Sequence, residues 1–77
     1  MHEFYIALHS VKDVQDFVTL ANVQPFDVNV SCGNIFVSGK SLMGMFCLGQ
    51  SSPLKVSVEC SDQAYQKFYN AADPFLA

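Results

Sequence analysis

Arginine is absent from the sequence and lysine is scarce, with four lysines against seven carboxylates and a formal net charge of −3. A protein that binds nucleic acid neutralises phosphate groups with clustered Lys and Arg side chains, and an anionic membrane surface attracts the same kind of cluster. The lysines here form no basic stripe. We therefore expect neither nucleic acid nor a membrane surface as a direct partner. The lysines are Lys12, Lys40, Lys55 and Lys67.

The sequence also lacks long apolar runs and paired cysteines. No stretch approaches the roughly 20 apolar residues of a membrane helix, and the chain does not begin with the basic and apolar segments of a signal peptide. Cys32, Cys47 and Cys60 form no CxxC pair, and the closely spaced Cys and His ligands that zinc requires are missing. We expect a cytoplasmic protein that needs no metal or cofactor and keeps its thiols reduced, buried or semi-buried.

Large apolar side chains are abundant in the sequence. Hydrophobic residues make up 51% of the chain, and seven Phe and three Tyr residues supply bulky core material. A chain of 77 residues can build one hydrophobic core but not two. We therefore expect residues 1–77 to form a single domain. Its stability should be modest, because a domain this small buries only about 60% of its unfolded surface.

Hydrophobic periodicity predicts alternating strands and helices. From residue 11 to residue 21 the apolar residues fall at helical spacing, and in the last helix Ala64, Phe68 and Ala71 define the apolar side. Residues 26–30 and 54–59 instead alternate apolar and polar side chains, as half-buried strands do. We expect strands at residues 3–8, 26–30, 35–39 and 54–59 and helices at residues 11–21, 41–48 and 61–72.

Turn and breaker residues separate these elements. Residues 31–34 supply turn chemistry between two strands, Gly49 is a helix stop signal, and residues 51–53 are expected to form a loop. The resulting order is βαββαβα. Four short strands joined in this way fit an α+β fold in which one antiparallel sheet has its helices on a single face, an open-faced sandwich.

A serine stands at the start of each predicted helix, namely Ser10, Ser41 and Ser61. A serine N-cap stabilises its helix by roughly 1 kcal/mol relative to alanine, and this role alone accounts for each of them. Asp13, three residues after Ser10, makes that start close to a capping box. A helix N-terminus also tolerates a phosphate, because unpaired N–H groups and the helix dipole favour negative charge there. Ser41 is therefore a candidate phosphorylation site as well as a cap.

The second predicted helix is apolar on all sides, since the thiol of Cys47 is the only polar side chain among residues 42–48. A short helix on a sheet can bury one face only. Met45 and Leu48 are expected to face the core. A patch of this kind is typical of a protein-binding surface, and methionine suits adaptable recognition; the alternative is that a loop or a dimer partner covers it. The side chains expected to stay partly exposed are Leu42, Met43 and Phe46.

Residues 39–49, GKSLMGMFCLG, resemble the regulatory-serine segment of the HPr family, which reads like AKSIMGVMSLG in low-GC Gram-positive members. Counted back without a gap, Asp16-Phe17-Val18 falls on the family's first-helix FV pair. The βαββαβα order is that family's fold as well. The resemblance covers most of residues 3–70, with a last helix that starts early and ends short. It implies an HPr-like protein of the bacterial phosphotransferase system.

The same register places a departure at the family's phosphotransfer site. The family pattern there is G-L-H-A-R-P, in which the histidine caps the first helix and receives phosphate from enzyme I. Here Ser10 takes the place of that histidine, Lys12 that of the arginine and Asp13 that of the proline. Serine cannot form a phosphoimidazole, and Asp13 brings negative charge where an incoming phosphate needs positive potential. His9 is one residue out of register, and such a shift turns a strand side chain to the opposite face.

The sequence keeps the regulatory serine, as Ser41, but has no histidine at position 10. This combination resembles the catabolite-repression HPr variants of Gram-positive bacteria. The resemblance implies that HPr kinase/phosphorylase phosphorylates Ser41 and that the phosphorylated form acts as corepressor with a CcpA-like regulator. Lysine at position 12 would weaken docking, because it lacks the bidentate fork of arginine. The docking surface would combine the second helix with the start of the first. Its expected residues are Val11, Lys12, Gln15, Leu42, Met43 and Phe46.

Two other hypotheses remain open. One is a phosphocarrier that uses His9, which a phosphohistidine assay with enzyme I would reveal. The other is an HPr-fold interaction module with neither phosphorylation, for instance a homodimer formed through the second helix. An enzyme is not expected, because the sequence offers no paired-carboxylate pocket, no nucleophile–base set and no metal-ligand spacing.

Overall fold

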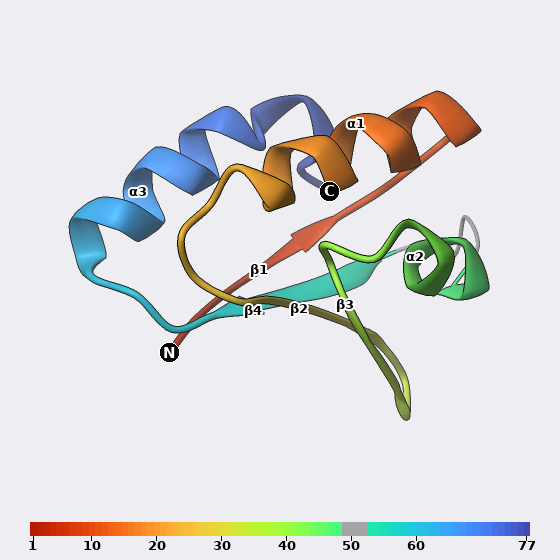
Figure 1. The fold of residues 1–77 in the computed structure, drawn as a ribbon, viewed down its shortest axis with the longest axis horizontal. Helices are drawn as coiled ribbons and strands as arrows, with labels where there is room; N and C mark the ends of the chain where they lie inside the picture. Colours follow the sequence, from red (N-terminus) through yellow and green to blue (C-terminus); the bar gives the residue numbers. More distant parts are fainter. Residues whose placement is uncertain (49–52) are drawn as a thin grey trace.

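The structure, a computed structural model, describes residues 1–48 and 53–77. Its element order is the predicted βαββαβα, followed by a short 3₁₀ turn (Figure 1). The predicted helix stop at Gly49 and the predicted loop residues 51 and 52 lie outside the described residues. The elements are β1 (His2–Ile6), α1 (Val11–Asn22), β2 (Val28–Cys32), β3 (Ile35–Ser38), α2 (Leu42–Leu48), β4 (Leu54–Val58), α3 (Asp62–Ala71) and η1 (Asp73–Phe75).

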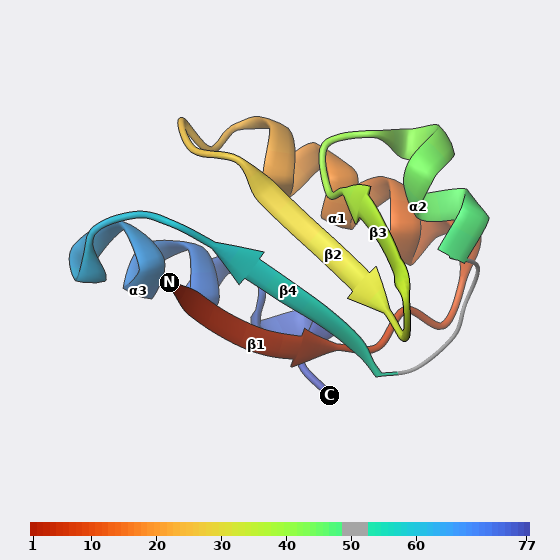
Figure 2. The ribbon, with the colours of Figure 1, turned by 90° about the horizontal axis from the view of Figure 1, so that it is seen from below.

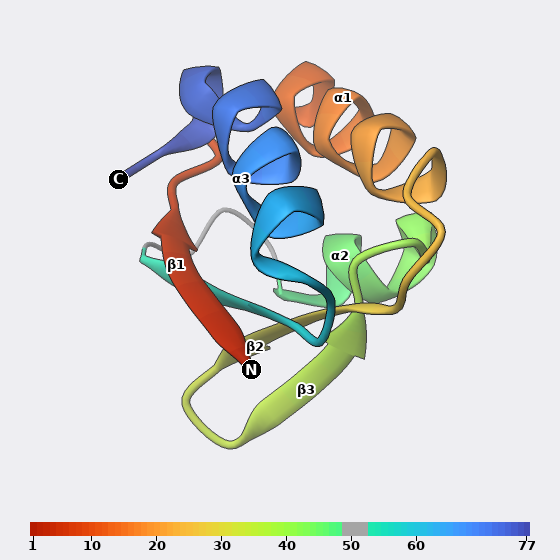
Figure 3. The same cartoon turned by 90° about the vertical axis from the view of Figure 1, so that its left-hand side faces the viewer.

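The four strands form one antiparallel sheet in the order β1-β4-β2-β3 (Figure 2). Period-two alternation gives this sheet an apolar face, on which every second residue of β1 and β4 is buried. The helices α1, α2 and α3 lie on that face, and the opposite face carries none of the described helices (Figure 3). The α+β open-faced sandwich predicted from the sequence is therefore confirmed.

The β2–β3 hairpin differs from the prediction. β2 starts and ends two residues later than the expected residues 26–30, so that it takes up two residues assigned to the turn. Phe26 is not in the strand, because its ring packs edge-on against Phe68 of α3 with the ring centroids 5.8 Å apart. The turn consists of Gly33 and the residue after it. Gly33 has a φ of 59°, as the first central position of a type II′ turn requires.

The last helix buries Phe68 as its spacing predicts, but the prediction for Ala71 was wrong. Ala71 is exposed, and the next residue, Ala72, is buried in its place. The reason is η1, which the sequence analysis did not predict. There the chain turns back and packs Phe75 edge-on against Phe17 of α1, with the ring centroids 5.8 Å apart. This contact draws the end of α3 onto the core and selects Ala72 as the inward residue.

The last residue of η1 and the two residues after it return to the outer edge of the sheet at β1. The N–H of Ala7 donates to the C=O of Phe75 at 2.8 Å, and the N–H of Ala77 donates to the C=O of Tyr5 at 3.1 Å. An antiparallel bridge joins the same two segments. The C-terminal residues therefore pair with part of an edge that would otherwise offer unpaired backbone groups.

Cys32, Cys47 and Cys60 are free thiols. Cys32 and Cys60 are half-buried, but Cys47 is exposed, which corrects the expectation that all of the thiols are at least semi-buried. It lies on α2, where Met45 and Leu48 occupy the inward side. Among the helices described here, none has both the length and the apolar character needed to cross a membrane.

The connection from β3 to α2 passes close to the sheet at Gly39. The N–H of Gly39 donates to the C=O of Val28 at 2.7 Å. A Cβ at this position would lie 2.7 Å from Cγ1 of Val28 and 3.2 Å from Cγ2 of Val30. Both valines are buried in the close-packed core, so neither can move away. A residue without a side chain is therefore needed where the chain leaves the sheet for Ser41.

We expect Gly39→Ala to lower the free energy of unfolding by about 1–3 kcal/mol, because the added methyl group overpacks the two valines. For a domain of this size the melting temperature should fall by roughly 5–15 °C, which circular dichroism measures. Val28→Ala removes the nearer methyl group, so the double variant should lose less stability than the two single variants together. Strict additivity would contradict a clash at this contact.

Candidate functional site

The first residues of α1 and the residue before it cap the N-terminus of this helix with their own side chains. Ser10 has an extended backbone, with φ −154° and ψ 165°, and its Oγ accepts a hydrogen bond from the N–H of Asp13 at 3.1 Å. Oδ2 of Asp13 in turn accepts from the N–H of His9 at 3.0 Å. The arrangement is close to a capping box, as expected. Its carboxylate, however, reaches the N–H of the residue before the cap rather than that of the cap itself.

The ammonium group of Lys12 is directed along α1. Its Nζ donates to Oδ2 of Asp16 at 2.9 Å, an i,i+4 ion pair on the surface. The hydrogen bond to Asp16, followed by the charge of Asp16, raises the pKa of Lys12 above its ordinary value. Because Asp13 adds a second carboxylate, the first turns of α1 have more negative than positive charge, and the one ammonium is already paired.

Ser41 caps α2. Its Oγ accepts from the N–H of Gly44 at 3.1 Å, and its C=O accepts from the N–H of Met45 at 3.0 Å. Ser61 caps α3 in the same way, with Oγ accepting from the N–H of Ala64 at 3.1 Å. A serine cap is therefore confirmed at the start of each helix. Ser41 is an exposed residue, and an enzyme can approach it from solvent.

The residue before Ser41 ties the start of α2 to the end of α1. Nζ of Lys40 donates to the C=O of Gln24 at 2.9 Å, and the C=O of Lys40 accepts from Nδ2 of Asn22 at 3.0 Å. Nδ2 of Asn22 also donates to the C=O of Val18 at 2.9 Å. These bonds hold α2 in place and engage the ammonium group that is nearest to Ser41 in the sequence.

The outward side of α2 carries an apolar patch formed by Leu42, Met43 and Phe46, which we call the α2 patch. These residues are 40%, 81% and 42% exposed, respectively. Met45 and Leu48 face the core and are buried, since a helix lying on a sheet buries one side only. The predicted division of this helix into a buried and an exposed apolar side is confirmed.

Val11, Lys12 and Gln15 were predicted to join the α2 patch, and all are exposed. Val11 is 54% exposed, although it belongs to the apolar spacing of α1. The helices α1 and α2 pack against each other, and the start of α1 lies at the same end of the molecule as the end of α2 (Figure 1, Figure 2). That these three residues and the α2 patch form one docking surface stays a prediction.

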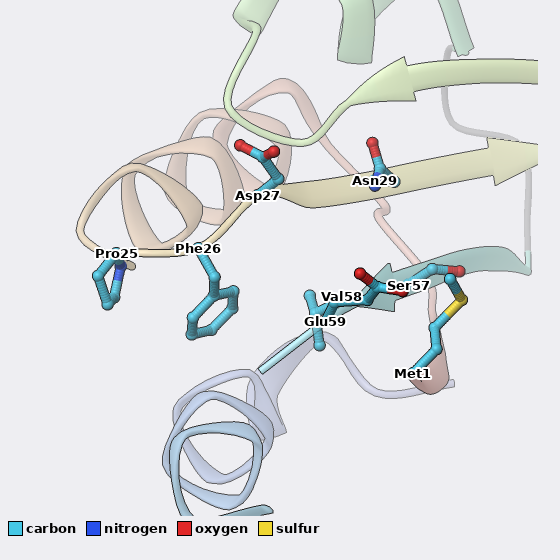
Figure 4. Close-up of a pocket in the computed structure, with 8 residues that line it drawn as sticks. All are labelled: Met1, Pro25, Phe26, Asp27, Asn29, Ser57, Val58 and Glu59. Atoms are coloured by element: carbon cyan, nitrogen blue, oxygen red, sulfur yellow. The ribbon is translucent and has the colours of Figure 1, made fainter. Parts of the chain in front are cut away.

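A pocket that the sequence analysis did not single out lies elsewhere. It has a volume of about 520 Å³ and opens where β1 and β2 begin and β4 ends. Figure 4 shows Phe26 at one side of it and Met1 at the other. The lining includes the carboxylates of Asp27 and Glu59 and none of the candidate residues above. Periodicity could not reveal this pocket, because it does not say which strand ends meet.

Element order, sheet order and helix placement together define an HPr-like α+β fold. The crystal structure of HPr-C-His from Thermoanaerobacter tengcongensis is similar, with a TM-score of 0.73 and 26% sequence identity over 95% of this chain and 92% of that chain. The protein therefore has the HPr-like phosphocarrier fold. No protein-family model and no curated protein matched the sequence.

We expect Ser10→Ala to lower the free energy of unfolding by about 1 kcal/mol, because the N–H of Asp13 loses its acceptor. Urea denaturation followed by circular dichroism measures this loss. Ser31→Ala is the matched control, since Ser31 lies within a strand and caps no helix; its effect should stay within about 0.5 kcal/mol. Equal losses at the two positions would contradict the capping role.

Proposed function

We propose that this protein is a regulatory HPr-like protein of the bacterial phosphotransferase system. It is phosphorylated at Ser41, docks to a partner protein through the α2 patch and does not carry phosphate on histidine. One observation carries the proposal, namely the exposed residue Ser41 immediately before the exposed α2 patch in a protein with the HPr-like fold. The GKSLMG segment around Ser41, which resembles the regulatory-serine segment of the HPr family, supports it.

The start of α1 supports the loss of the carrier role. By resemblance, Ser10 stands where the phosphate-accepting histidine would be. The N–H groups of His9 and Asp13, which could otherwise bind a phosphate, already donate to oxygen atoms of the chain. Lys12 is held by Asp16, and an incoming phosphate would meet the carboxylate of Asp13. Each feature removes part of the positive potential that stabilises a transferring phosphoryl group.

Phosphorylation of Ser41 would act directly on the α2 patch. A phosphate brings a charge of about −1.5 to −2 and three strong acceptor oxygens. One of these oxygens can keep the hydrogen bond from the N–H of Gly44 that the hydroxyl accepts now. Because Lys40 is engaged with Gln24, the remaining oxygens stay available for a cation of the partner. An arginine next to an apolar pocket on the partner would recognise the phosphate and the patch together.

The enzyme and the partner follow from the resemblance. They are HPr kinase/phosphorylase, which would phosphorylate Ser41, and a CcpA-like regulator, which would bind the phosphorylated form. The protein is acted on by other enzymes and is not itself one. Docking should be weaker than for an arginine-containing relative, because the ammonium of Lys12 cannot form a bidentate pair and is already bound to Asp16.

Incubation with ATP and HPr kinase/phosphorylase should add a single phosphate, and peptide mapping by mass spectrometry should place it on Ser41. Ser41→Ala should abolish the reaction. Ser10→Ala and Ser61→Ala are matched controls, because each removes a hydroxyl that caps a helix in the same way. Both should leave the phosphorylation intact. Phosphate on either of these serines instead of Ser41 would contradict the assignment.

A parallel reaction with enzyme I and phosphoenolpyruvate separates this proposal from its alternatives. We expect no phosphate, because serine at position 10 cannot form a phosphoimidazole and the carboxylate of Asp13, which accepts from the backbone N–H of His9, places negative charge beside that residue. Phosphate on His9 would establish a carrier. Phosphate in neither reaction would overturn the proposal and leave an interaction module.

Met43→Ala should weaken binding of the Ser41-phosphorylated protein to a CcpA-like regulator by about tenfold or more, the effect typical of a central apolar anchor. Isothermal titration calorimetry measures the affinity. Phe36→Ala is the matched control, since Phe36 is 75% exposed and Met43 81% but Phe36 lies on β3. The control should change the affinity by less than about twofold. Similar losses in both variants would contradict a docking surface centred on the α2 patch.

A further inference from the structure

The strand β3 is a short outer strand of the sheet and lacks the charge, the proline and the bulge that often keep such an edge from pairing with another chain. Protected edges carry charged residues, proline or a bulge. β3 reads Ile35-Phe36-Val37-Ser38 and contains no charge or proline. Ile35 and Phe36 are 56% and 75% exposed. They lie near the tip of the β2–β3 hairpin, which projects beyond the helices (Figure 1).

The ladder with β2 determines which backbone groups of β3 face outward. The N–H of Gly39 donates to the C=O of Val28, so these residues form a hydrogen-bonded pair of the antiparallel ladder. Such pairs alternate with non-bonded ones, which makes Val37 and Val30 the next bonded pair. Phe36 falls between two bonded pairs. Its N–H and C=O therefore point away from β2, toward the position that a further strand would occupy.

The two edges of the sheet differ in how their outward backbone groups are hydrogen-bonded. At β1 the C-terminal residues pair with the outer edge, through the N–H of Ala77 and the C=O of Tyr5 among other bonds. At β3 the C=O of Ser38 accepts from the N–H of Ser41, which occupies the end of the strand next to α2. The outward groups of Phe36, nearer the hairpin tip, keep the geometry of an open strand edge.

We propose that β3 pairs antiparallel with β3 of a second copy of this chain, across a two-fold axis at Phe36. A strand paired antiparallel with its own copy is self-complementary and closes as a dimer. Phe36 exchanges two N–H···O bonds with Phe36 of the second copy. The same register sets Ile35 opposite Val37 of the second copy, on the apolar face. The axis lies toward the hairpin tip, away from the end of β3 that leads into α2.

The charges near the axis favour a second copy over a charged partner. On the open face, Phe36 shares a cross-strand row with Ser31, Lys55 and Tyr5. Lys55 is the only charged member of this row, and its Nζ lies 3.2 Å from Oε2 of Glu3. This row therefore places no unpaired charge at the axis, and the two Phe36 rings form a cross-strand aromatic pair.

The proposed contact is small, because β3 has four residues, and an interface of this size belongs to the weak and transient class. A dissociation constant of roughly 0.1–1 mM is expected. The α2 patch lies outside the contact. The dimer therefore does not depend on phosphorylation of Ser41, and its failure would leave the proposed function untouched.

Sedimentation velocity from about 10 μM to about 1 mM protein tests the proposal in the range where a weak dimer forms. The average mass should rise from the monomer's 8.5 kDa toward twice that value. Phe36→Lys places two like charges across the axis and should keep the protein monomeric at every concentration. Met43→Lys introduces the same charge at a residue of similar exposure on α2 and should dimerise as the unchanged protein does. A monomeric unchanged protein, or loss of the dimer in Met43→Lys alone, would overturn the proposal.

Amide hydrogen exchange by NMR gives a second readout that needs no variant. Raising the concentration over the same range should slow exchange of the Phe36 N–H several-fold, because this group becomes bonded across the axis. The N–H of Val37 is already bonded within the sheet and serves as the internal control. Unchanged exchange at Phe36, or new protection on β1 in its place, would show that β3 is not the contact.

Discussion

The apolar face of the sheet is the constraint on which the rest of the structure depends. Alternation along β1, β2 and β4 places one row of buried side chains on each strand, and water must be excluded from all of them. α1 and α3, with twelve and ten residues, cover most of this face, and α2 adds seven residues beside β2 and β3. Because α2 is apolar on all sides, burying its inner side leaves the α2 patch exposed.

Each of the three helices has unpaired backbone N–H groups at its N-terminus, and a serine caps each helix. Only the residues next to the serine differ. Ser10, Ser41 and Ser61 each accept a hydrogen bond from the N–H three residues later. After Ser10 the sequence supplies a carboxylate that binds the N–H of His9. The residues that follow Ser41 instead form the exposed α2 patch. A cap is thus a structural device at each site, and the surrounding charge and apolar surface determine what else the serine can do.

Sequence periodicity predicted the element order, because that order depends on local spacing. The division of α2 into a buried and an exposed side was instead expected because a helix lying on a sheet buries one side only. Periodicity misplaced β2, since the alternation that includes Phe26 is broken by a contact with Phe68, distant in the chain. It chose Ala71 over Ala72 for a similar reason, because η1 and its Phe75–Phe17 contact are tertiary features. It identified β3 as a strand but could not place it at an edge, since alternation carries no information on strand order. The bond from His9 to Asp13 was missed because a capping box normally bonds the cap residue itself.

The distribution of charge explains why a phosphate at Ser41 would have a large effect. Residues 41–54 contain no charged side chain, and Lys40, just before them, is bound to Gln24. A charge added to an apolar surface acts most strongly once a partner has displaced water from around it, because the local dielectric then falls. At the start of α1 a phosphate would meet Asp13 and Asp16, so much of its attraction for a cation would be offset. The proposed function therefore places the modification at Ser41, where the charge is not offset, and not at the start of α1, where nearby carboxylates oppose it.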